Sequence, residues 1–338
     1  MRVAGISSPG NAPSGPLDAS QAVAIFRAAC LSRALDRTSR AMQRAGQGFY
    51  TIGSSGHEGM AAVATALRPT DMAFLHYRDA AFQIARSAQV PGQSIAWDML
   101  LSFAASSEDP ISGGRHKVLG SKALNIPPQT STIASHLPKA VGAAYSIGAA
   151  RRLRPEHATL PDDAIIMASF GDASANHSTA QGAFNTAGWT AYQSIPMPLL
   201  FVCEDNGIGI STKTPKGWIA AGFRNRPGLQ YFACDGLDIY QTFQTALAAA
   251  ARDGRSRHRP TVAPDDPAAG WQQRRQLGIA EQGVAAELEA LHREGFPLGA
   301  RRRLGARRRH WRGQRLRRLQ LRRALERVGN RPGSQRVG

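Results

Sequence analysis

Hydrophobic and polar residues along the first 250 positions alternate with helical spacing in several stretches. Asp18 or Ser20 can cap a helix that runs to Arg44, with apolar residues at mostly helical spacing. The glycines at 46 and 48 end it. The same pattern predicts further helices over residues 59–67, 80–87, 137–152 and 178–192.

Two short apolar runs have the length of buried strands. They cover residues 164–170 and 198–203, and a predicted helix, 178–192, lies between them. A strand, a helix and a second strand in that order are typical of parallel strands joined by a right-handed crossover. We therefore predict an α/β fold, a doubly wound parallel sheet with flanking helices.

Polar residues follow both predicted strands. Gly-Asp-Ala-Ser stands at 171–174, and Glu-Asp-Asn-Gly stands at 204–207. Parallel strands open on the same edge of a sheet, where α/β folds bind ligands. The oxygens of Asp172 and Asn206, together with a backbone carbonyl, suit Mg²⁺ and a diphosphate. Each segment alone fits an ordinary turn after a strand, but their pairing across one crossover favours the metal-diphosphate site.

Residues 46–250 resemble the alpha component of thiamine-diphosphate-dependent 2-oxo acid dehydrogenases. The resemblance rests on four segments: the glycine-rich stretch 46–59, His-Tyr-Arg-Asp at 76–79, residues 131–145, and the pair 171–173 and 205–206. The family has Gly-Asp-Gly and Asn-Asn at that pair. Here Ala173 replaces the last Gly and Asp205 replaces the first Asn, and neither is an expected ligand of the metal ion.

The resemblance implies a thiamine-diphosphate-binding fold and a specific set of contacts. Mg²⁺ would be held by Asp172, Asn206 and the Ile208 carbonyl. The cofactor-binding residues would be Tyr77, Arg78, Ser131, Ile133, Gly171, Asp172, Ala173, Ser174, Asn206 and Ile210. The resemblance does not identify a catalytic residue in this chain, although His136 is a candidate.

The implied reaction is oxidative decarboxylation of a 2-oxo acid, with acyl transfer to a lipoyl group on a partner transacylase. The substrate would be pyruvate or a branched-chain 2-oxo acid of the 3-methyl-2-oxobutanoate type, and residues 206–212 look closest to branched-chain relatives. A beta component or fused beta half would supply the activating glutamate. The chain would then act in a hetero- or homo-oligomer and be inactive alone.

Basic residues are concentrated near the C-terminus. The formal net charge is +18, but residues 251–338 hold 22 Arg, no Lys and 8 acidic residues. We expect residues 1–45 to form a lead-in and helix, residues 46–254 the cofactor-binding domain, and residues 255–338 a disordered or irregular Arg-rich tail. Loss of Lys, Met and Tyr from this tail suggests a GC-rich gene read in a shifted frame.

The Arg-rich tail also leaves a second function open, that of a noncatalytic basic protein that binds nucleic acid. Its only tryptophans after residue 254 are Trp271 and Trp311, and it matches no known nucleic-acid module, so no specific nucleic acid is expected.

Other sequence features argue against several further classes of protein. Three widely spaced cysteines, without a CxxC pair, favour reduced thiols in a cytoplasmic protein. No apolar run reaches the length of a membrane span, and no membrane contact is expected. No G-x-G-x-x-G follows a strand, so nicotinamide binding is not expected. The histidine spacings match no zinc site, and His177 has no assigned role.

Overall fold

The structure is a computed structural model that describes residues 16–49, 52–210, 212–255 and 261–264. These residues belong to one compact unit of the chain, residues 1–276. The predicted disorder and shifted reading frame of the tail concern residues that lie almost wholly outside the described ones. That part of the interpretation therefore stays a prediction.

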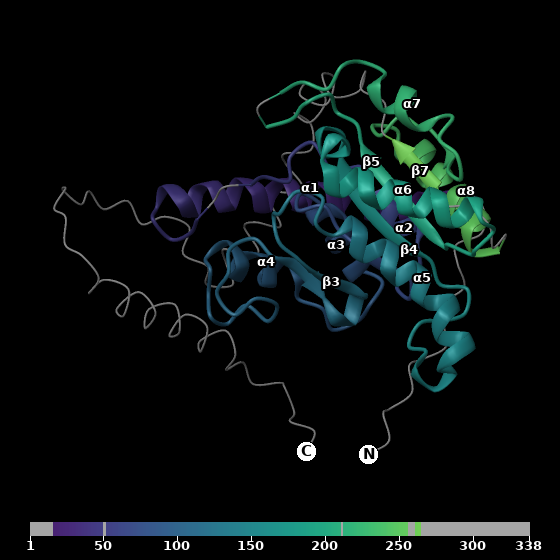
Figure 1. Cartoon of the computed structure of the whole chain (residues 1–338). Helices are drawn as coiled ribbons and strands as arrows, with labels where there is room; N and C mark the ends of the chain where they lie inside the picture. The colour runs from purple at the N-terminus through teal and green to yellow at the C-terminus, as the bar shows by residue number, and fades with distance from the viewer. Residues whose placement is uncertain (1–15, 50–51, 211, 256–260, 265–338) are drawn as a thin grey trace. The chain divides into compact units, whose positions relative to one another are not determined.

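The described residues contain a five-stranded sheet in which every neighbouring pair of strands is parallel (Figure 1). Its order is β1 (Met72–Phe74), β4 (Ile166–Gly171), β5 (Leu199–Glu204), β7 (Thr261–Pro264) and β6 (Gln230–Tyr231). A separate antiparallel pair joins β2 (Leu119–Ser121) and β3 (Ile126–Gln129). The predicted parallel α/β fold is confirmed.

The predicted helices are present with nearly the expected bounds. They are α1 (Ala19–Arg44), α2 (Met60–Ala66), α3 (Ala80–Ser87), α5 (Leu137–Leu153) and α6 (Ser178–Tyr192). The sequence patterns did not predict α4 (Ile95–Phe103), α7 (Trp218–Phe223), α8 (Ile239–Arg255) or the short 3-10 turns η1 (Lys122–Leu124), η2 (Pro155–His157) and η3 (Asp172–Asn176). No helix in the described ranges is long and apolar enough to cross a bilayer.

Helix α1 begins at a capping box. Asp18 Oδ1 accepts a hydrogen bond from the Gln21 N–H at 2.8 Å, and the Asp18 N–H donates to Gln21 Oε1 at 3.1 Å. Its buried residues include Ile25 and Leu35 but also Ser32, Asp36 and Ser39, whereas the apolar Val23 and Phe26 are about half exposed. The bounds of the helix agree with the prediction, but its buried face agrees only in part with the predicted apolar positions.

The core on one face of the sheet consists of alternate residues of β4 and β5. Ile166, Ala168 and Phe170 in β4, and Leu199, Phe201 and Cys203 in β5, pack against α5 and α6, which lie in front of these strands in Figure 1. The intervening residues are buried too, and α8 contacts β5 and β7. Burial of both faces explains why these strands are continuous apolar runs.

The sheet extends beyond the predicted domain boundary at residue 254. Thr261–Pro264, assigned from composition to the tail, form β7, in which Val262 pairs with Phe201 and with Tyr231. β7 therefore lies past the predicted boundary, and a four-residue strand within an Arg-rich stretch has too few residues to show a period.

Candidate functional site

The carboxyl ends of β1, β4 and β5 lie side by side and carry most of the predicted site residues. In the register of the sheet, Phe74 pairs with Ala168, and Gly171 pairs with Glu204. Tyr77 and Arg78 follow β1, Asp172 to Ser174 follow β4, and Asn206 to Ile210 follow β5. The topology therefore brings three separate segments to one edge of the sheet.

Asp172 is the first residue of η3 and is only 2% exposed. Its Oδ2 atom is buried and has no hydrogen-bond partner in the described part of the chain. The loop after β5 reaches this segment, because a β-carbon placed on Gly209 would lie 2.9 Å from the Ala173 β-carbon. The two segments predicted to bind Mg²⁺ are thus neighbours at the same edge.

The loop after β5 has a defined hydrogen-bonding pattern. Asn206 Oδ1 accepts from the Ile208 N–H at 3.0 Å, and Ile208 forms an isolated antiparallel bridge with Lys213. An amide oxygen has two lone pairs, so this bond leaves Asn206 Oδ1 able to accept a second partner. The side chains of Ile208 and Ile210 are 57% and 79% exposed.

Arg78 holds the glycine-rich segment next to the candidate site. Its Nη1 atom donates to the Gly53 carbonyl at 2.5 Å, and its guanidinium lies over the buried Tyr77 ring, 5.2 Å from the centroid. At the next residue, the Ser54 N–H donates to Asp36 Oδ1 at 3.1 Å. Two side chains thus hold the segment, and the predicted diphosphate contacts of Tyr77 and Arg78 stay predictions.

Ser131 and Ile133 lie on the loop between β3 and α5, and both are exposed. His136 ties this loop to the sheet, since its Nε2 atom lies 2.6 Å from the Ser169 carbonyl oxygen in β4. Burial lowers the pKa of His136 to about 4, so the ring is neutral at pH 7 and donates to this carbonyl. These contacts favour a structural role for His136, and its suggested catalytic role stays a prediction.

A buried cluster at the same edge was not anticipated from the sequence. It comprises His57, His76, Asp79 and Glu204, each less than a tenth exposed. Glu204 Oε1 lies 3.1 Å from His76 Nδ1, and Glu204 Oε2 is hydrogen-bonded to His57 Nδ1. Asp79 Oδ2 accepts from the Ser169 hydroxyl, whereas Asp79 Oδ1 lies 3.9 Å from His76 Nδ1.

The charges within this cluster depend on one another. Burial works against ionisation of Glu204, but the charge and hydrogen bonding of His57 and His76 outweigh it and hold the carboxyl pKa below its usual range. Burial also opposes protonation of His57, yet Glu204 raises its pKa. For His76, burial prevails and lowers the pKa. Burial and the Glu204 charge raise the pKa of Asp79 well above its usual value.

His177, which the sequence left without a role, begins α6. Its ring Nδ1 accepts a hydrogen bond from the Thr179 N–H at 3.2 Å, and the side chain is exposed. The residue therefore caps a helix that starts at the candidate site.

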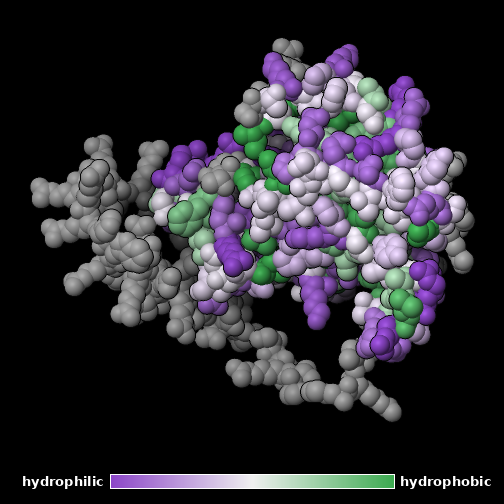
Figure 2. All heavy atoms as spheres, in the orientation of Figure 1, coloured by the Kyte–Doolittle hydropathy of each residue, from purple (hydrophilic) through white to green (hydrophobic). Residues whose placement is uncertain are grey.

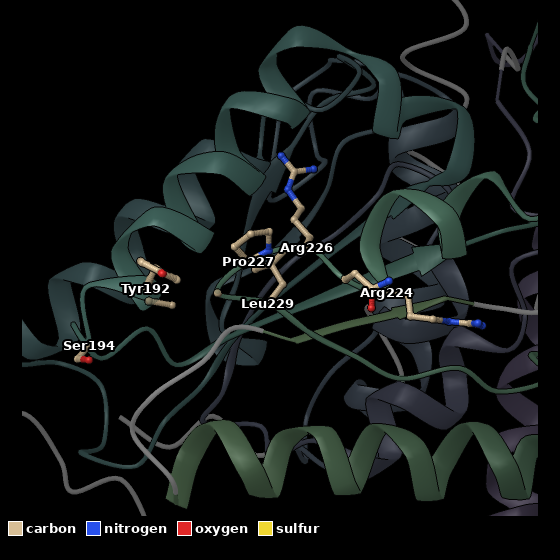
Figure 3. A pocket seen from close by; sticks show the side chains of 9 residues that line it. Tyr192, Ser194, Arg224, Arg226, Pro227 and Leu229 are labelled. Carbon is tan, nitrogen blue, oxygen red and sulfur yellow. The ribbon is translucent and has the colours of Figure 1, made fainter.

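An open hollow of about 460 Å³ lies at the other end of α6. It is lined by the last turn of that helix and by residues 224–229, including Tyr192, Arg224 and Arg226 (Figure 3). None of the predicted cofactor-binding residues lines it. The hollow is therefore distinct from the site at the carboxyl edge.

Residues 26–263 match the model of the dehydrogenase E1 component family. This chain belongs to that family. The match covers more than half of the chain and reaches into β7, which agrees with a sheet that continues past residue 254. The predicted resemblance to the alpha component of 2-oxo acid dehydrogenases is confirmed.

The chain is similar to several proteins named as alpha subunits of 2-oxoisovalerate dehydrogenase. The mitochondrial 2-oxoisovalerate dehydrogenase subunit alpha of Mus musculus is 28% identical over 233 residues, which are 67% of this chain and 48% of that protein. Alpha subunit 2 of Arabidopsis thaliana is 28% identical over 243 residues, 69% of this chain and 47% of that protein. The chain spans about half the length of these relatives.

Solved structures similar to this E1 component include two transketolases. That of Campylobacter jejuni has a TM-score of 0.48 at 13% identity, covering 72% of this chain and 37% of the other. That of Leishmania mexicana has a TM-score of 0.46 at 14% identity, covering 74% of this chain and 37% of the other.

Proposed function

We propose that this E1 component chain is the thiamine-diphosphate- and Mg²⁺-binding part of a 2-oxo acid dehydrogenase of the branched-chain type. The observation that carries the proposal is the buried Asp172 Oδ2 atom, which has no partner among the described residues and lies beside the Asn206 loop. The names of the alpha-subunit relatives support the branched-chain substrate class.

The side chains present fit a hard divalent cation bound to a diphosphate. A buried carboxylate oxygen without a hydrogen-bond partner is costly, and a cation at Asp172 Oδ2 would remove that cost. Asn206 and the Ile208 carbonyl would complete an oxygen ligand set typical of Mg²⁺. Arg78 would contact the diphosphate oxygens, and the small residues Ala173 and Ser174 would allow it to approach the backbone.

The remaining predicted contacts orient the cofactor rings. Ser131 and Ile133 would contact the aminopyrimidine and the thiazolium, with Ile210 on the opposite loop. Bound thiamine diphosphate supplies the electron sink that decarboxylation of a 2-oxo acid requires. The chain's part is to hold the diphosphate, fix the ring orientation and keep the loop carrying Ser131 against β4 through His136.

Exposed apolar side chains beside the site favour a partner that covers it. Ile133, Ile208 and Ile210 are 39%, 57% and 79% exposed on the two loops. On the face drawn in Figure 2, hydrophilic residues predominate and hydrophobic ones form small groups. We infer that a beta component or fused beta half packs on these loops and supplies the activating glutamate. A lipoyl-bearing transacylase would then accept the acyl group, in a cytoplasmic hetero- or homo-oligomer.

The alternative function, nucleic-acid binding through residues 255–338, rests on residues outside the described ones, apart from β7 and Arg255. No contact in the described structure favours it over the cofactor site.

Calorimetric titration of the full chain with thiamine diphosphate tests the proposal. We expect saturable binding with Mg²⁺ present and its loss when a chelator removes the metal. Asp172→Asn should weaken binding at least tenfold, because a neutral amide cannot balance the cation. Asp162→Asn is the matched control, since its side chain is 83% exposed just before β4, at the other edge of the sheet. Binding that ignores both Mg²⁺ and Asp172→Asn would contradict the assignment.

A further inference from the structure

We propose that His57, His76, Asp79 and Glu204 form a second, buried metal site that takes a divalent transition ion such as Zn²⁺. Each residue offers one ligand atom, and these atoms all lie within 4.8 Å of one another. The proposal is independent of the cofactor assignment, because it uses none of the residues expected to bind Mg²⁺ or the diphosphate.

Three separate segments supply the ligands. His57 precedes α2, His76 and Asp79 lie between β1 and α3, and Glu204 ends β5. All four side chains are buried, with exposures of 7%, 4%, 0% and 2% in sequence order. Surface carboxylates come together in many proteins without an ion, whereas these four side chains are removed from water, where charged groups are costly unless they are paired or bind a metal.

One ligand atom of the cluster lacks a partner. Asp79 Oδ1 is buried and accepts no hydrogen bond from any described residue, although the Ser169 hydroxyl holds the other carboxylate oxygen. This Oδ1 atom lies 3.9 Å from His76 Nδ1. A buried carboxylate oxygen that lies beside His76 and accepts no hydrogen bond is the feature that a bound cation would explain.

The donor set and its charge indicate the type of ion. In the metal-bound state both imidazoles are neutral and both carboxylates are ionised, so the four ligands carry a formal charge of −2, which one divalent cation balances. Mixed nitrogen and oxygen donors suit Zn²⁺, whereas Mg²⁺ and Ca²⁺ prefer oxygen alone. Zinc bonds of about 2.1 Å place tetrahedral ligands roughly 3.5 Å apart. A pair at the 4.8 Å limit would therefore close by about 1.3 Å.

This second site would lie next to the cofactor site without sharing ligands. A β-carbon on Gly171 would lie 3.6 Å from His76 Cε1, and Gly171 directly precedes Asp172. The two sites therefore flank the end of β4. A metal at the second site would join the segment carrying His57 to the ends of β1 and β5. It would thereby hold these three segments together at the carboxyl edge of the sheet.

Metal analysis of the full chain tests the proposal. The purified protein is stripped with a chelator, dialysed against Zn²⁺ with excess Mg²⁺, and its bound zinc is measured. We expect one tightly bound Zn²⁺ per chain, and at least tenfold weaker binding for His76→Gln and for Asp79→Asn. His157→Gln is the control for surface histidines, because its side chain is 73% exposed, and it should keep the zinc. Unchanged zinc affinity in the first two variants would overturn the proposal.

Cobalt substitution provides a measurement on the unaltered sequence, which does not depend on how a variant folds. Co²⁺ added to the stripped chain should give the intense visible bands of a four-coordinate ion, without a thiolate charge-transfer band. The weak spectrum of hydrated Co²⁺ would contradict a buried site. Asp172→Asn should lose thiamine diphosphate binding and keep the zinc, so failure of either site is recognised separately.

Discussion

Gly209 and Ala173 lie closer than two side chains could. A β-carbon on Gly209 would come within 2.9 Å of the Ala173 β-carbon and 2.7 Å of the Thr212 carbonyl oxygen. The family pattern has glycine at position 173, so the alanine here uses space that the glycine at 209 leaves. The loop that carries Asn206 and Ile208 therefore packs closely against the segment that follows β4.

We therefore expect Gly209→Ala to displace that loop. Overpacking of this kind typically costs about 1–3 kcal/mol of stability, and Mg²⁺-dependent binding of thiamine diphosphate should weaken at least tenfold. Urea denaturation and calorimetry measure the two effects. Gly182→Ala is the matched control, because a β-carbon at this exposed α6 position meets nothing within 4 Å. Normal cofactor binding by Gly209→Ala would show that the loop position does not matter.

Local signals predicted the central part of this fold. The apolar runs of β4 and β5 and the helical period of α6 are long enough to show their type, and the polar residues after each strand marked the edge where ligands bind. The other strands of the five-stranded sheet, β1, β6 and β7, have two to four residues and cannot show a period. They were therefore found only in the structure.

The buried cluster could not be predicted for a different reason. His57 and Glu204 are 147 positions apart in the sequence, and only the tertiary structure brings them into contact. A search for zinc ligands at short sequence spacing misses such a set. The available signal was partial: Glu204 directly follows the predicted strand 198–203, whereas β1, which places His76 at the same edge, was not predicted.

Lys117 gives the stability of the protein a specific pH dependence. Its side chain is 2% exposed, its Nζ atom donates to Ser54 Oγ at 3.1 Å, and burial lowers its pKa to about 8. A lysine whose pKa is lower in the folded state destabilises the fold while it is charged. The unfolded chain binds the extra proton between pH 8 and the ordinary value of 10.5, so stability should rise with pH across that window.

The change from about 8 to 10.5 corresponds to roughly 3 kcal/mol for this one group. Lys117→Met keeps the length of the side chain and removes the charge, so its stability should gain less over the same window. Urea denaturation of both proteins at pH 7.5 and pH 10 measures the difference. Parallel pH profiles for the two proteins would show that Lys117 does not titrate there.

Phe184 is the centre of an aromatic group in the core. Its ring lies 4.9 Å from that of Phe223, 5.0 Å from that of Phe201 and 5.1 Å from that of Phe170, measured between centroids. Phe184→Ala should cost about 3–5 kcal/mol because it leaves a cavity among these rings. Tyr192→Ala on the same helix should change stability by less than about 0.5 kcal/mol, since that side chain is 76% exposed. Equal losses in chemical denaturation would contradict this placement of the core.

The full chain alone should show little or no decarboxylation of 3-methyl-2-oxobutanoate or pyruvate. The reason is the division of the proposed site: this chain supplies oxygen ligands and phosphate contacts, while the activating glutamate is expected from a beta component or fused beta half. The exposed side chains of Ile133 and Ile210 mark where that partner would pack.

The assay uses the purified chain with Mg²⁺, thiamine diphosphate and a dye that accepts electrons. Calorimetry on the same preparation shows whether the cofactor is bound, so that inactivity caused by an empty site is recognised. Addition of a beta component should then produce turnover that Asp172→Asn removes. Dye reduction by the isolated chain, if it too is removed by Asp172→Asn, would mean that the chain contains its own activating residue and that the proposed division of the site is wrong.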